Sequence, residues 1–232
     1  MKTLGIIGGI APESTIEYYS FIIESFHKQE PDGNYPSLLI NSVNLKQMIE
    51  LITANRLAEI ADILTVEIQK LARAGADFAL MASNTPHIVF DEVERRSPIP
   101  MLSIVQATCD AAKAMGLNKI GLFGTRFTMQ GKFYPETFAR QGITLVTPDA
   151  DDQTFIHTKY MGELINGVFL DETRQGLLAI LERFKQTTGI EGLILGGTEL
   201  PIILREAAQN DFPFLDTTKI HVAAAVAQMF AD

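Results

Sequence analysis

The second half of the chain repeats the pattern of the first half in three places. Residues 4–9 are echoed by residues 120–125, residues 75–83 by residues 189–197, and residues 99–103 by residues 212–216. The echoes keep their order and lie about 115 positions apart, as expected of a duplicated structural unit. Each echo contains a short apolar run, which is typical of a buried strand. The sequence therefore predicts two lobes of similar plan.

Longer amphipathic segments separate these predicted strands. One of them carries apolar residues at spacings of three and four, which indicates a helix: Leu57, Ile60, Leu64, Ile68 and Leu71. Strands that alternate with helices favour parallel sheets covered on both faces. We expect an α/β fold with two pseudo-symmetric lobes, each a parallel sheet flanked by helices, and a ligand cleft between them.

The repeat also sets the predicted domain boundaries. The first lobe comprises residues 1–104 plus 217–232, and the second comprises residues 105–216. A final helix is predicted over residues 220–230, and its apolar positions would suit either lobe.

Composition excludes several classes of protein. The 232 residues carry 19 Lys and Arg against 28 Asp and Glu, a net charge of −9, whereas nucleic-acid binding favours a basic face. The single cysteine, Cys109, excludes an intramolecular disulfide and a thiolate metal cluster, and we interpret it as a buried, inert thiol. Apolar runs are too short to cross a membrane, and no signal-peptide pattern is present, so we expect a cytoplasmic protein.

Polar turns follow the predicted strands at four places: residues 8–10, 83–85, 124–126 and 196–199. Ligands of parallel sheets bind beyond the carboxyl ends of the strands. Each turn also precedes a predicted helix, whose unpaired N–H groups attract anions. We therefore expect the turns to surround one cleft and to bind a small carboxylate or an amino acid.

Each of these turns also has a structural interpretation. The pair of glycines ending at Gly9 can serve only as a tight turn, and Asn84, Thr85 or Thr198 can cap a helix. Glu199 can favour the start of its helix or act as an acid or base.

Three further observations concern charged and titratable groups. Arg126 could bind a carboxylate or could simply be solvated. His87 could reach the cleft or could be structural. None of the four histidines has the spacing of a metal site, so no metal is indicated.

Taken together, the turns resemble those of the aspartate/glutamate racemase family. The resemblance rests on residues 4–9, 83–87, 124–129, 196–199 and 216–221, and it extends over nearly the whole chain. It implies an enzyme without a cofactor and a homodimer. It also implies substrate binding by the turn residues Gly9, Ile10, Asn84, Thr85, Thr125, Gly197 and Thr198.

The chain departs from the family at both catalytic positions. Family members place one cysteine in each lobe, whereas this chain has Ser83 at the first position and Gly197 at the second. A thiol readily forms a thiolate near neutral pH, a serine hydroxyl needs a neighbouring base, and glycine has no side chain. Racemisation by two thiols is therefore excluded. Ser83, with His87 as a conceivable base, and Glu199 are the predicted catalytic candidates.

Three functions are compatible with these residues. The first is an isomerase that acts on aspartate, glutamate or a similar small carboxylate. The second is a catalytically silent protein that binds a small carboxylate. The third is a decarboxylase or lyase that uses the same cleft.

Overall fold

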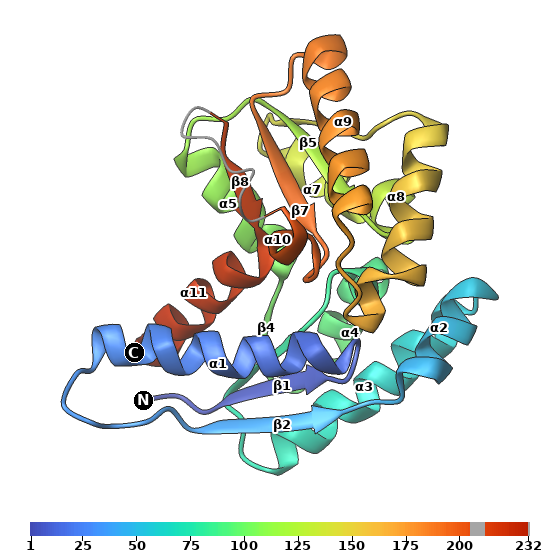
Figure 1. The fold of residues 1–232 in the computed structure, drawn as a ribbon. Coiled ribbons are helices and arrows are strands. Elements are labelled where there is room, and N and C mark those ends of the chain that lie inside the picture. Colours follow the sequence, from blue (N-terminus) through green and yellow to red (C-terminus); the bar gives the residue numbers. More distant parts are fainter. Residues whose placement is uncertain (205–211, 232) are drawn as a thin grey trace. The chain divides into compact units, whose positions relative to one another are not determined.

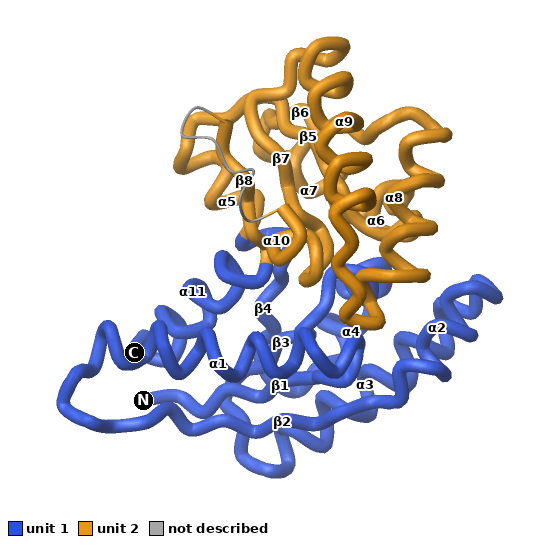
Figure 2. The backbone as a smooth tube through the Cα atoms, in the orientation of Figure 1, with its two compact units in different colours: residues 1–107, 218–232 blue, residues 108–217 orange. Residues whose placement is uncertain are grey.

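The computed structural model describes residues 1–204 and 212–231. The chain divides into two compact units, of which unit 1 comprises residues 1–107 and 218–232 and unit 2 comprises residues 108–217 (Figure 2). The chain passes into unit 2 within helix α5 (Ile104–Ala114) and returns at the start of helix α11 (Thr217–Phe230).

Unit 1 is built on a parallel sheet with the strand order β2-β1-β3-β4 (Figure 2), in which β1 and β2 run side by side (Figure 1). The strands are β1 (Leu4–Gly8), β2 (Leu38–Ser42), β3 (Phe78–Met81) and β4 (Met101–Leu102). The helical segments are α1 (Pro12–Gln29), α2 (Leu45–Thr53), α3 (Leu57–Arg73), η1 (Thr85–Val89), α4 (Phe90–Arg96) and α11.

Unit 2 has the same strand plan, with the order β6-β5-β7-β8 and parallel pairing throughout. Its strands are β5 (Lys119–Gly124), β6 (Thr144–Val146), β7 (Gly192–Gly196) and β8 (Phe214–Asp216). Its helical segments are α6 (Arg126–Gln130), α7 (Phe133–Arg140), α8 (Ala150–Gly162), η2 (Leu164–Asn166), α9 (Asp171–Thr188) and α10 (Leu200–Ile203). The predicted α/β class with two parallel sheets is confirmed.

Alternation along β1 explains how the sheet of unit 1 is covered. Leu4 and Ile6 join a core cluster with side chains from α1 and α11. Gly5 faces the opposite side, where a Cβ atom would meet Leu71 of α3 at 3.2 Å. Successive residues of a strand point to opposite faces, so the apolar strand sequence requires helices on both sides.

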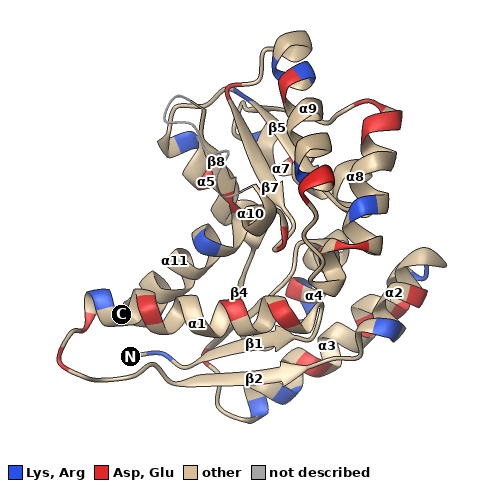
Figure 3. Cartoon of the chain, in the orientation of Figure 1, with Lys and Arg blue, Asp and Glu red and all other residues tan. Residues whose placement is uncertain are grey.

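Unit 2 has its own core. Phe123, Leu193 and Leu195 of the central strands pack with side chains of α8 and α9, including Ile156 and Phe184. The central strands β1, β3 and β7 contain no charged residue, and the charges lie mainly on helices and connections (Figure 3). Burial of this apolar surface is the main force that holds each unit together.

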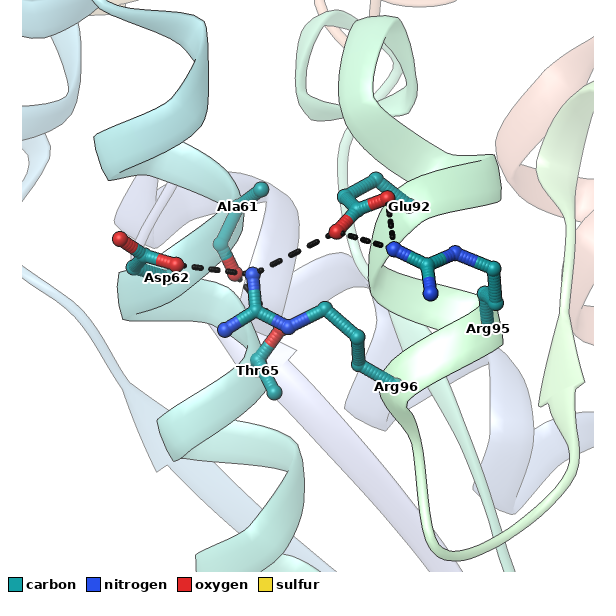
Figure 4. A network of polar contacts seen from close by, with 6 residues as sticks. All are labelled: Ala61, Asp62, Thr65, Glu92, Arg95 and Arg96. Carbon is teal, nitrogen blue, oxygen red and sulfur yellow. Dashed lines mark hydrogen bonds and ion pairs between the residues drawn. The ribbon is translucent and has the colours of Figure 1, made fainter.

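Ion pairs connect α3 to α4, the helix that follows the turn at residues 83–85. The Arg96 guanidinium lies 2.8 Å from Asp62 of α3 and 3.7 Å from Glu92, which also accepts hydrogen bonds from Arg95 (Figure 4). Exposed pairs of this kind contribute about 0–1 kcal/mol each, so apolar packing still dominates here.

Candidate functional site

In unit 1, two of the predicted turns begin side by side. Strands β1 and β3 are adjacent, and Ile7 pairs with Met81. The turn that contains Gly9 and the turn that contains Ser83 therefore leave the same edge of the sheet, at the carboxyl ends of its two central strands. This is the edge at which parallel sheets bind ligands.

Gly9 is required by its surroundings. Its φ of +86° is rarely adopted by other residues, and a Cβ atom there would lie 2.6 Å from the Ser42 Oγ atom. Its N–H group donates a hydrogen bond to the Thr15 hydroxyl at 2.8 Å. The next residue, Ile10, is buried. The N–H of Gly9 is thus already paired with a side chain of α1.

Ser83 lies half-buried just beyond β3, and its neighbour His87 contacts its backbone carbonyl oxygen. The Ile104 N–H group donates to His87 Nε2 at 3.2 Å, so the ring hydrogen lies on Nδ1, which donates to the Ser83 carbonyl oxygen at 2.9 Å. Burial, with a smaller effect from His221, lowers the pKa of His87 to about 3. Because both ring nitrogens are bonded to backbone groups, His87 cannot take the proton of Ser83.

The other predicted binding residues of this turn, Asn84 and Thr85, do not form a simple helix cap. Asn84 is buried at the position before η1, but its side chain does not cap that helix. Thr85 is the first residue of η1 and is half-buried. Their role in ligand binding stays a prediction.

In unit 2, the second pair of turns also begins side by side, because Gly124 of β5 pairs with Gly196 of β7. Thr125 caps α6, and its hydroxyl oxygen accepts a hydrogen bond from the Thr128 N–H group at 3.3 Å. The neighbouring Arg126 is exposed, and its backbone N–H donates to His157 Nδ1 at 3.1 Å.

Gly197, at the second predicted catalytic position, is packed against a tyrosine that the sequence did not single out. A Cβ atom at residue 197 would lie 2.6 Å from the Tyr160 hydroxyl oxygen. The Tyr160 hydroxyl donates a hydrogen bond to Oε2 of Glu199, and the Thr198 hydroxyl donates to the same oxygen at 2.8 Å. The space beside Gly197 is therefore filled by the phenol.

Tyr160 and Glu199 are each 5% exposed, so their contact is shielded from solvent. Burial, together with the negative charge of Glu199, raises the pKa of Tyr160 well above its ordinary value. The phenol consequently stays protonated and serves as the hydrogen-bond donor. Apolar spacing in α8, with Ile156 four residues before Tyr160, could have predicted that this tyrosine is buried, but not its polar partner.

Cys109 lies in α5, and its thiol contacts the Thr137 carbonyl oxygen at 3.9 Å. The residue is fully buried, and burial raises the pKa of the thiol. Within residues 1–204 and 212–231, no group of three or more His, Cys, Asp or Glu residues is arranged to hold a metal ion, and no helix is long and apolar enough to cross a membrane.

A family model described as Asp/Glu/Hydantoin racemase matches residues 7–225. The chain belongs to this racemase family. This chain is 23% identical to a curated relative, the broad specificity amino-acid racemase RacX of Bacillus subtilis (strain 168), and the match covers 98% of each chain.

Solved structures agree with this family assignment. A Yersinia pestis protein proposed to be an Asp/Glu racemase is 31% identical, with a TM-score of 0.90 and full coverage of both chains. An aspartate racemase homologue from Pyrococcus horikoshii OT3 is 32% identical, with a TM-score of 0.84 and full coverage of both chains. Membership and these neighbours support a racemase-type isomerase whose ligand is a small amino acid.

Proposed function

We propose that this family member is an isomerase that removes and returns the Cα proton of aspartate, glutamate or a similar small carboxylate without using a thiol. The observation that carries the proposal is the burial and hydrogen bonding of the Glu199 side chain. Its carboxylate is buried at the carboxyl end of β7, and one oxygen, Oε2, is held by two hydroxyl groups. Among the described residues, none donates a hydrogen bond to the other oxygen, Oε1.

Each of the two candidate residues has a distinct role in this proposal. Oε1 of Glu199 accepts the Cα proton, and the carbanion that forms is stabilised by the substrate's own carboxyl group. The Ser83 hydroxyl returns a proton to the opposite face and is reprotonated by water, and Glu199 releases the proton that it accepted to water. When Glu199 removes the Cα proton, Ser83 acts as an acid and needs no neighbouring base. This agrees with the hydrogen bonds between both His87 ring nitrogens and backbone groups.

Substrate binding is assigned, as part of the proposal, to the turns that hold these two residues. They are Gly9, Ile10, Asn84, Thr85, Thr125, Gly197 and Thr198. The support is their position at the carboxyl ends of the central strands in each unit. That both units serve one substrate stays a prediction from the sequence.

Chiral chromatography of L- and D-amino acids after incubation with the purified protein tests the proposal. We expect interconversion of the enantiomers of at least one acidic amino acid. Glu199→Gln and Ser83→Ala should each lower the rate at least tenfold, whereas Glu172→Gln, at an exposed position of α9, should leave it unchanged. No interconversion of any amino acid would refute the proposal.

One observation favours a second candidate, a protein that binds a small carboxylate without catalysis. The space beside Gly197, the second predicted catalytic position, is filled by Tyr160, so no side chain at that position can act on a substrate. Calorimetric titration with aspartate, glutamate and succinate distinguishes the two candidates. Binding without exchange of the Cα proton would favour the second.

The family resemblance also suggests a cytoplasmic homodimer that needs no cofactor, and we include these features in the proposal. Light scattering of the purified protein tests the dimer. Activity that survives dialysis against a chelator tests the independence from metals.

A further inference from the structure

Tyr160 is a buried polar side chain at the candidate site that has no role in the proposed mechanism. It projects from α8 into the space beside Gly197, where the side chain of any other residue at position 197 would begin. Gly197 therefore not only lacks a catalytic side chain but also makes room for the phenol of Tyr160. It is the only residue that leaves room for the phenol in this arrangement.

Among the described residues, the polar partners of the Tyr160 phenol lie in the turn at residues 197–199. Its hydroxyl donates to Glu199 Oε2, and the phenol also bonds with Thr198 and with the backbone of Glu199. Thr198 in turn donates to the same Oε2 atom at 2.8 Å. Two hydroxyl groups thus fix one oxygen of the carboxylate, and among the described residues none donates to Oε1.

We propose that Tyr160 is a positioning residue: it takes the space freed by Gly197 and orients Glu199 so that Oε1 is the oxygen that exchanges a proton with the substrate. This inference rests on the proposed function, because it assigns Glu199 the role of acid and base. A buried carboxylate held at one oxygen has few orientations left, and a fixed orientation is what general base catalysis requires.

The protonation state of the phenol is consistent with this role. A neutral phenol donates its hydrogen to the carboxylate and leaves the negative charge on Glu199, where it can accept the Cα proton. Tyr160 stays un-ionised at every stage, so it takes no part in the proton transfers of Glu199 and Ser83.

The test measures solvent-deuterium incorporation at the Cα atom of aspartate and glutamate, with kcat and KM determined for wild-type protein, Y160F, E199Q and the double variant. We expect Y160F to lower kcat at least tenfold and to change KM less than threefold. In the E199Q background, Y160F should have no further effect, because a residue that acts through Glu199 loses its role when the carboxylate is absent.

Tyr134→Phe is the matched control. Tyr134 is a fully buried tyrosine of the same unit, whose hydroxyl bonds to Thr108 instead of to the candidate site. Y134F should lower stability as much as Y160F does and should leave kcat within twofold of wild type. Thermal unfolding of both variants verifies that they are folded at the assay temperature.

The outcomes separate this inference from the proposed function. An active wild type whose kcat is unchanged in Y160F would overturn the inference and leave the proposed function standing. Independent effects of Y160F and E199Q on kcat would also overturn the inference alone. A wild type that incorporates no deuterium into either amino acid would overturn the proposed function, and this inference with it.

Discussion

The Nδ1 atom of His87 donates a hydrogen bond to the carbonyl oxygen of Ser83 at 2.9 Å. This bond joins η1 to the residue just beyond β3, and the Ile104 N–H group is a second hydrogen-bond partner of the imidazole. The ring therefore fixes the backbone on which the Ser83 hydroxyl is carried.

Replacement of His87 should lower stability more than it changes chemistry. His87→Phe removes the hydrogen bonds of the ring with the Ser83 carbonyl oxygen and the Ile104 N–H group, at an expected cost of about 2–4 kcal/mol. Urea unfolding measures this loss. The control is His157→Asn, at a half-buried position, for which we expect a cost below about 1 kcal/mol. Equal costs for the two variants would contradict the structural role of His87.

Two buried histidines, His87 and His221, make the stability of the protein depend on pH. Burial lowers the pKa of His87 to about 3 and that of His221 to about 4, from an ordinary value of 6.5. In the unfolded chain both histidines bind protons as the pH falls below about 6.5, whereas in the folded chain they do not. Stability should therefore be fully present above this pH and should decline on acidification.

We expect the free energy of unfolding to fall by about 2–3 kcal/mol between pH 7 and pH 5.5, a range chosen to lie above the titration of ordinary carboxylates. Urea unfolding at the two pH values measures the change. A free energy of unfolding that is constant across this range, or that increases on acidification, would show that the histidines titrate normally in the folded protein.

A methyl group at position 197 should destabilise the protein through Tyr160. The added carbon of Gly197→Ala would lie 2.6 Å from the phenol oxygen, so we expect a loss of about 1–3 kcal/mol. Gly162→Ala is the matched control, because a Cβ atom there meets nothing within 4 Å. In a Tyr160→Ala background the effect of Gly197→Ala should largely disappear. An equally large loss of stability in that background would show that the added methyl group collides with a part of the protein other than Tyr160.

Restoring the two family cysteines should fail unless Tyr160 is also shortened. In the double variant Ser83→Cys, Gly197→Cys, the new thiol at residue 197 begins in space that the phenol fills. We expect racemisation of aspartate or glutamate to be faster in the triple variant with Tyr160→Ala than in the double variant. A rate in the double variant that equals or exceeds that of the triple variant would contradict this packing.

The strands and the class of fold could be predicted because apolar runs and their repetition are local properties of the sequence. The echoed segments at residues 4–9 and 120–125 contain most of β1 and β5. Helix α11 begins at Thr217, directly after β8 and three residues before the predicted start at 220. The Thr217 hydroxyl donates a hydrogen bond to the Leu195 carbonyl oxygen of β7, a contact that no local pattern indicates.

The polar contacts of the candidate site could not be predicted in this way. Tyr160 and Glu199 are 39 positions apart, and His87 and Ile104 are 17 apart, so no local spacing connects them. Periodicity identifies which side chains are buried, but the hydrogen-bond partner of a buried polar group depends on how distant elements pack. For this reason the sequence does not single out Tyr160, and it leaves open that His87 acts as a base.

Incorporation of solvent deuterium at the Cα atom of aspartate and glutamate by the Cys109→Ala variant shows whether the reaction needs a thiol. This variant contains no thiol, and Cys109 is buried in α5. We expect this variant to exchange the Cα hydrogen at the wild-type rate, and we expect Glu199→Gln to lower the exchange at least tenfold. Activity that is present in the wild type and lost in Cys109→Ala would show that the reaction depends on the thiol, and it would contradict a mechanism carried by Glu199 and Ser83.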